Sequence, residues 1–160
     1  MVLLRVEQMS SSQSERKPQP KTRDAFRHFT TFDTRWRDND CYGHLNNAIY
    51  YELFDSAINR LLLDNGALTF GSGDHVFLVA SSGCNYFNEL AYPLKLEVGL
   101  AVSRLGNSSV TYDLGLFKQG AKQTAASGFF VHVHVLRDTY QPMPIQAKDR
   151  TVFLDLFVAS

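Results

Sequence analysis

One long stretch with helical periodicity, set among strand patterns, restricts the fold of this chain more than any other feature. Apolar side chains from residue 50 to residue 62 recur at spacings of three and four, which is the period of an amphipathic helix. The pair Asn65-Gly66 ends this pattern, because both residues tolerate the left-handed conformation needed after a helix end. We therefore expect one helix of about four to five turns.

Alternating apolar and polar residues predict strands on both sides of this helix. Before it, Phe32, Thr34 and Trp36 alternate with charged residues, which is typical of a half-buried strand. After it, strand-like runs cover about 75–90, 94–103, 110–116 and 125–138. Turns of hairpin length join most of them, and such turns make neighbouring strands antiparallel. The expected fold class is α+β, with one central helix packed against a curled antiparallel sheet of about five strands.

A single helix covers only one face of such a sheet, so the other face needs water or a partner. We expect this second face to carry aromatic groups, including Phe117 and Phe130. Self-association of the chain would cover them.

The composition limits where the protein works and what it binds. The formal net charge is zero, which gives no general attraction to nucleic acid or to an anionic membrane. The two cysteines, Cys41 and Cys84, are too few for a disulfide framework and lack the spacing of a metal site. No signal peptide and no membrane-spanning run is recognised. A cytoplasmic location is the simplest expectation.

The chain divides into three parts by composition. Residues 1–24 are rich in Ser, Gln, Lys and Pro and are expected to form a flexible N-terminal arm. Residues 25–141 carry the helix and strand patterns of one domain. In the C-terminal tail, 142–160, prolines interrupt the strand pattern, and the run "TVFLDLFV" is compatible with a short helix.

Polar residues crowd the beginning of the predicted helix. Asp40 lies on a turn that contains Gly43, a few residues before a helix that begins between Leu45 and Asn47. A helix start presents unpaired N–H groups and the positive end of the helix dipole, which suit a developing oxyanion. A carboxylate beside such amides is suited to acyl transfer, and a thioester is a fitting substrate because its thiolate leaves easily.

Each of these residues also has a purely structural interpretation. Asp40 could cap its own turn, and the two asparagines Asn46 and Asn47 could serve as helix N-caps. His44 could be a surface residue, and Asp38 a charge at the end of a strand. Composition and spacing leave both interpretations open.

The segment "DNDCYGHLNNAIYYELFDSA" resembles the D-x-D-x-x-G-H-x-N-N-x-x-Y signature of hotdog-fold acyl-CoA thioesterases, in the 4-hydroxybenzoyl-CoA thioesterase and YbgC-like group. The resemblance implies that Asp40 is the nucleophile or general base and that a backbone amide at or next to Asn47 binds the oxyanion. It also implies that His44 and Asn46 shape the catalytic site. In a second branch of the family the acid lies on the helix, where Glu52 or Asp55 would stand.

The resemblance further implies an acyl-CoA substrate, no cofactor, and a homodimer or homotetramer with sheets joined edge to edge. The expected substrate-binding residues are Tyr42, Gly43, Tyr50, Arg104 and Lys118, the last two as contacts for phosphate groups, with Lys122 and Arg137 as further candidates. Related plant-type acyl-carrier-protein thioesterases have asparagine at the position of Tyr42. Their particular catalytic arrangement is therefore not expected here.

Three other functions fit less well. His132 and His134 share one strand face, but two histidines are too few for a zinc site. The sequence lacks the stripe of basic residues that nucleic-acid binding would need. A hotdog dehydratase would carry a G-H-F-P-G type motif where this chain has "GHLNN". The remaining alternative is a hotdog protein that binds acyl-CoA without turnover.

Overall fold

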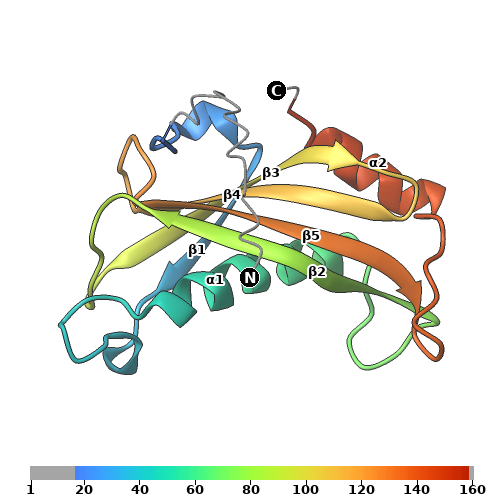
Figure 1. Ribbon diagram of the computed structural model, residues 1–160, viewed down its shortest axis with the longest axis horizontal. Coiled ribbons are helices and arrows are strands. Elements are labelled where there is room, and N and C mark those ends of the chain that lie inside the picture. The colour runs from blue at the N-terminus through green and yellow to red at the C-terminus, as the bar shows by residue number, and fades with distance from the viewer. Residues whose placement is uncertain (1–16, 159–160) are drawn as a thin grey trace, which may run out of the picture.

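The computed structural model of the protein describes residues 17–158 and contains one curled antiparallel sheet (Figure 1). In space the five strands follow the order β1-β3-β4-β5-β2, so that β1 and β2 form its edges. The strands are β1 (His28–Asp33), β2 (His75–Tyr86), β3 (Lys95–Leu105), β4 (Ser109–Lys118) and β5 (Ala126–Leu136). Every pairing is antiparallel. The expected sheet is confirmed.

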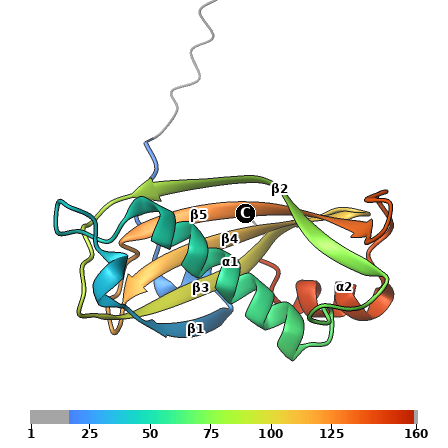
Figure 2. The ribbon, with the colours of Figure 1, turned by 90° about the horizontal axis from the view of Figure 1, so that it is seen from below.

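The long helix α1 (Asn47–Asp64) crosses one face of this sheet (Figure 2). It ends at Asp64 with Asn65 as its C-cap, where the sequence predicted the end, and Gly66 follows with a φ of +67°. The helix buries the apolar stripe Tyr50, Leu53, Phe54, Ala57, Ile58, Leu61 and Leu62. Helix and sheet meet closely at Gly128, where a Cβ atom would lie 2.7 Å from the ring of Phe54. Together these elements make up the predicted hotdog fold.

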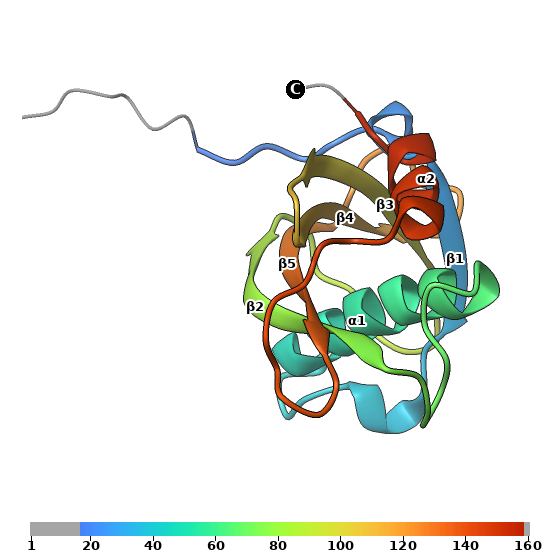
Figure 3. The same cartoon turned by 90° about the vertical axis from the view of Figure 1, so that its right-hand side faces the viewer.

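A second helix, α2 (Ala147–Asp155), packs beside the C-terminal part of α1 and against the same sheet (Figure 3). Phe153 of this helix is fully buried and meets Tyr112 and Phe77 edge to face. The segment after this helix, around Phe157, forms a short bridge with Val102 of β3. This bridge lies beyond the part of β3 that pairs with β1. Residues from the predicted tail therefore contribute to the core.

A short 3-10 helix, η1 (Arg23–Ala25), leads into an aromatic cluster on the outer face of the sheet. The ring of Phe26 lies over Gly99 and Gly115, which are paired across β3 and β4, and meets Phe117 edge to face. The guanidinium of Arg23 stacks on Phe117 and pairs with Glu97. The outer face is therefore partly covered by the chain's own N-terminal segment.

Phe130 corrects the expectation for the outer face. It lies on the inner face, buried against Phe54 and Tyr51 of α1, because β5 turns its even-numbered side chains toward the helix. Phe117 does lie on the outer face, as expected.

The first predicted strand was too long. β1 ends at Asp33, and the 3-10 helix η2 (Trp36–Asp38) follows, with Trp36 82% exposed. The buried carboxylate of Asp38 accepts hydrogen bonds from both the backbone N–H and the side chain of Arg35, which turns the chain out of the sheet. Alternation of apolar residues alone did not reveal this turn.

The predicted N-terminal arm lies mostly outside the described residues. In its described part, the backbone N–H of Lys21 donates to Oγ1 of Thr124, and the Lys21 carbonyl accepts the backbone N–H of Thr124. The Lys21 ammonium pairs with Asp113 at 2.7 Å. No helix within 17–158 is both long and apolar enough to cross a membrane.

Candidate active site

The turn before α1 is a small hairpin closed by Asp40. The backbone N–H of Asp40 donates to the carbonyl of His44 at 2.8 Å, and Gly43 allows the reversal with a φ of +85°. The Oδ1 atom of Asp40 accepts hydrogen bonds from the backbone N–H groups of Tyr42 at 2.8 Å and of His44 at 3.3 Å. The structural interpretation of Asp40 as a turn cap is therefore correct for one oxygen. Its Oδ2 accepts no hydrogen bond from residues 17–158.

The start of α1 is held from both sides. Asn46 is the N-cap, and its side chain accepts the backbone N–H of Ala48 at 2.9 Å. The backbone N–H of Asn46 donates to the carbonyl of Asp38 at 2.8 Å, which ties the helix to the turn. No acidic residue lies in the first helical turn, so the positive end of the dipole is not neutralised there. The backbone N–H of Asn47 finds no acceptor among the described residues.

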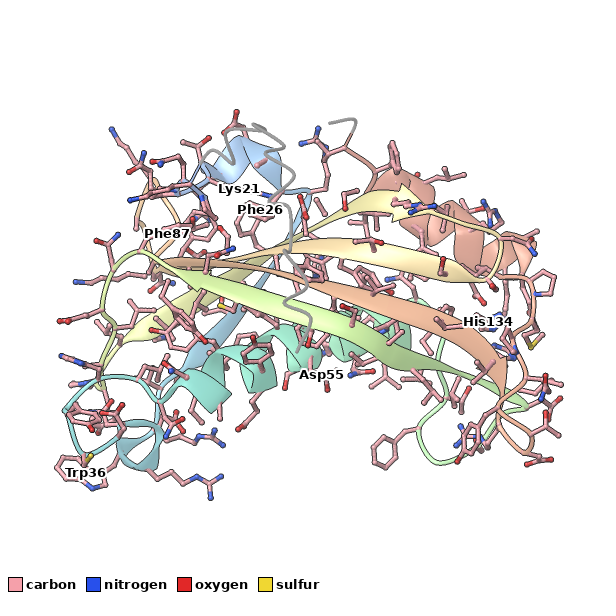
Figure 4. All side chains as sticks on the ribbon, viewed as in Figure 1. Lys21, Phe26, Trp36, Asp55, Phe87 and His134 are labelled. Atoms are coloured by element: carbon pink, nitrogen blue, oxygen red, sulfur yellow. The ribbon has the colours of Figure 1, made fainter. Side chains whose placement is uncertain are left out.

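A cavity of about 270 Å³ opens between this helix start and the end of β2. Its lining residues are Asp40, His44, Leu45, Asn47, Tyr50, Tyr86, Phe87, Asn88 and Glu89. Figure 4 shows Phe87 at the same end of the molecule as the loop that carries Trp36. The structure thus brings together four of the predicted site residues, namely Asp40, His44, Asn47 and Tyr50.

Aromatic rings form the apolar wall of this cavity. The rings of Tyr50 and Tyr86 meet edge to face, with centroids 4.9 Å apart. Burial, reinforced by the neighbouring Cys84 and Asp40, raises the pKa of Tyr50 to about 12. Its hydroxyl is therefore neutral at pH 7 and can donate a hydrogen bond.

Glu89 supplies an acid that sequence reasoning did not find. Its Oε2 atom lies 3.2 Å from Nε2 of His44. Phe87 and Asn88, also absent from the predicted site, lie beside it on the cavity wall. They follow β2, far from the motif in the chain, and local sequence carries no signal of that proximity. Only the position of β2 at the edge of the sheet brings them there.

Residues 34–153 match the family model described as the Thioesterase-like superfamily. The chain belongs to this superfamily. The predicted thioester hydrolase class is therefore confirmed, while assignment to the YbgC-like group stays a prediction.

Solved structures agree with the superfamily. The PA5185 protein from Pseudomonas aeruginosa strain PAO1 is 44% identical with a TM-score of 0.85, over 87% of this chain and 97% of that one. A 1,4-dihydroxy-2-naphthoyl-CoA thioesterase from Synechocystis is 16% identical with a TM-score of 0.71, covering 80% and 96%. The gentisyl-coenzyme A thioesterase BH1999 is 21% identical with a TM-score of 0.68, covering 79% and 99%. The last two likenesses show the fold alone. No curated protein matches the sequence.

Other predicted site residues of this thioesterase-like protein lie outside the cavity. Tyr42 is 80% exposed, and Gly43 shapes the turn without lining the cavity. Arg104 faces Thr111 across the ladder of β3 and β4, and Lys118 ends β4. Their contacts with substrate stay predictions.

The two alternative acids on α1 also lie outside the cavity. The carboxylate of Glu52 accepts a hydrogen bond from Arg35 at 2.9 Å. Asp55, labelled in Figure 4, is half-buried, and burial raises its pKa. Neither lines the cavity beside the helix start, which favours Asp40 as the reacting acid.

His132 and His134 both lie on the inner face of β5, but they have different neighbours. His132 packs edge to face against Tyr112, and burial lowers its pKa to about 4. His134 instead meets His75 and Asp149. The pair that the sequence considered does not form one site.

Proposed function

We propose that this protein hydrolyses acyl-CoA thioesters to a free acid and coenzyme A. The observation that carries the proposal is the cavity lined by both Asp40 and Asn47, the latter with a first-turn amide that has no acceptor among residues 17–158. A base or nucleophile next to oxyanion donors is the arrangement that acyl transfer requires.

In the proposed reaction the thioester carbonyl oxygen points to the backbone N–H of Asn47. Through its Oδ2, Asp40 either removes a proton from a water that attacks the carbonyl carbon, or attacks that carbon itself. In both routes the C–S bond breaks and the thiolate of coenzyme A leaves and takes up a proton. The direct route forms a mixed anhydride that a water molecule then hydrolyses, so acid-quenched enzyme would carry the acyl mass only in that route.

His44 and Asn46 act on the geometry of the site in this proposal. The imidazole of His44, held by Glu89 at 3.2 Å, forms the cavity wall next to Asp40. Asn46 keeps the helix start in place through its cap. Tyr50 contacts the acyl group or the thioester oxygen, where its neutral hydroxyl can donate a hydrogen bond.

The decisive experiment compares the parent protein with Asp40→Asn on a panel of aliphatic and aromatic acyl-CoAs. Asparagine keeps the Oδ1 acceptor that closes the turn, so the fold is retained while the base is lost. We expect kcat to fall by about 10²–10⁴-fold. Loss of thioester absorbance is the preferred signal, because exposed Cys41 would consume a thiol reagent.

The matched control is Asp33→Asn, which removes an exposed acid that does not line the cavity. It should keep the parent kcat. Parent-like turnover in Asp40→Asn would overturn the role of Asp40. If several acyl-CoAs bind and none is hydrolysed by the parent, the protein is instead a non-catalytic acyl-CoA-binding member of the fold.

We further propose a homodimer, which can pair into a homotetramer, joined through the edge strand β2. Leu78 and Val79 on this strand are 40% and 49% exposed, and the strand's far end at Tyr86 lines the cavity. A partner there would cover apolar surface and enclose the acyl group. Arg104 and Lys118 of either subunit would then be available to coenzyme A phosphates. Light scattering should give at least twice the chain mass, and Val79→Lys should lower it to the monomer.

A further inference from the structure

Three chemically distinctive side chains meet at one end of the sheet, away from the cavity. His75 opens β2, His134 lies near the end of β5, and Asp149 stands in the first turn of α2. One potential ligand atom from each lies within 4.8 Å of the other two. Figure 4 shows His134 at the opposite end of the molecule from Trp36.

The hydrogen bonds of His134 determine which of its nitrogens is free. Its Nδ1 atom lies 3.2 Å from the carbonyl oxygen of Met143 and 3.0 Å from that of Pro144. Carbonyl oxygens only accept, so Nδ1 carries a proton, and in the neutral imidazole Nε2 then keeps an unshared electron pair. An imidazole that donates one N–H to a backbone carbonyl and presents the other nitrogen is the usual arrangement of a metal-bound histidine.

The same cluster holds a second buried acceptor, the carboxylate of Asp149. Both His134 and Asp149 are at most 1% exposed, and neither Nε2 nor Oδ2 has a hydrogen-bond partner within residues 17–158. Two acceptors cannot satisfy each other, and leaving them unpaired in the interior is costly. His75 does not resolve this, because its Nε2 atom lies 4.0 Å from Oδ2 of Asp149, beyond hydrogen-bond distance.

We propose that His75, His134 and Asp149 bind a divalent transition-metal ion, with zinc as the preferred metal. Two imidazoles and one carboxylate form a common three-ligand zinc set, and water would complete the tetrahedron. Donor atoms around tetrahedral zinc lie about 3.3 Å apart, so the cluster, with ligand atoms within 4.8 Å of one another, must contract by up to about 1.5 Å. His75 can supply this movement, because its side chain is 18% exposed while the other two ligands are fixed by burial.

The ion would connect α2 to β2 and β5, two strands that already pair with each other through backbone hydrogen bonds. It would fasten α2 to the ends of β2 and β5, where Phe77 stacks on His134 and meets Phe153 edge to face. The cavity begins at the other end of β2, about 35 Å along the strand from His75. The proposed metal site is therefore independent of the proposed thioesterase reaction.

The test uses tag-free protein treated with EDTA, desalted, and titrated with Zn²⁺ or Co²⁺. Binding of one equivalent per chain is expected, with the visible bands of tetrahedral Co²⁺ and displacement of Co²⁺ by Zn²⁺. Saturating Zn²⁺ should raise Tm by about 5–10 °C through mass action on the folded state.

Two ligand variants and one control assign the site. Asp149→Asn and His75→Gln should each weaken Zn²⁺ binding by ~100-fold or more and abolish the shift in Tm. His44→Gln is the control: it removes a histidine that lies close to a carboxylate, that of Glu89, outside the proposed metal site. This variant should bind Zn²⁺ like the parent. Less than stoichiometric binding by the parent, or full binding by His75→Gln, would overturn the proposal even if Asp149→Asn fails to fold.

Discussion

Replacing Asp38 by asparagine tests whether a buried acid holds the turn of the candidate site in place. The Asp38 side chain is 3% exposed and accepts two hydrogen bonds from Arg35, at 2.7 Å from the backbone N–H and at 2.9 Å from Nε. Its backbone carbonyl accepts the N–H of Asn46 at the start of α1. The residue therefore connects the end of the strand, the turn and the helix.

The magnitude follows from these contacts. Asparagine offers one acceptor oxygen in place of two, so its NH₂ group must face one of the Arg35 donors. An unpaired buried donor costs about 1–3 kcal/mol, and the loss of the charge from the remaining bond adds about 1 kcal/mol. We expect Asp38→Asn to lower the free energy of unfolding by about 2–4 kcal/mol and Tm by about 5–15 °C.

The assay is urea denaturation at pH 7, followed by far-UV circular dichroism, with kcat/KM measured well below Tm. Asp33→Asn is the control, because its carboxylate is 74% exposed and lies 3.9 Å from Lys95. The control should change stability by less than about 0.5 kcal/mol. Equal denaturation midpoints for the two variants would refute the proposed support by Asp38. A large loss of stability with unchanged kcat/KM would show that Asp38 stabilises the fold but does not position the residues of the candidate site.

Three further predictions concern other parts of the molecule. Gly115→Ala should cost about 1–3 kcal/mol, because the new Cβ would overlap both the ring of Phe26 and Cγ2 of Thr124, and a Phe26→Ala background should remove only the part of that cost due to the ring in a double-mutant cycle. Hydrogen bonding to the Arg23 guanidinium lowers the pKa of Glu97, so its contribution is present at pH 7 and is lost as the pH falls through the lowered pKa; Glu97→Gln should cost about 0.5–1 kcal/mol at pH 7 and progressively less on acidification. Burial raises the pKa of the Cys84 thiol, so iodoacetamide at pH 8 should label exposed Cys41 first by mass spectrometry.

Sequence patterns predicted the parts of the fold that depend on near neighbours along the chain. The helix begins at Asn47 and ends before Asn65, because its apolar period and its capping residues act within a few positions. The same reasoning was wrong for Trp36. Its alternation matched a strand, while the buried contacts of Asp38 with Arg35 started a turn.

The sequence by itself also determined half of the candidate site, since Asp40, His44, Asn46 and Asn47 lie within eight positions of one another. A short turn and a helix start place such neighbours together whatever the rest of the chain does.

The tertiary structure decided the other half. Tyr86 and Glu89 reach the cavity because β2 is the edge strand next to β5, and strand order is set by the packing of the whole sheet. His75, His134 and Asp149 likewise meet only because two strands and α2 end at one place. Local periodicity records which face of an element is buried, but it does not record which element covers that face. That choice depends on contacts between residues far apart in the chain.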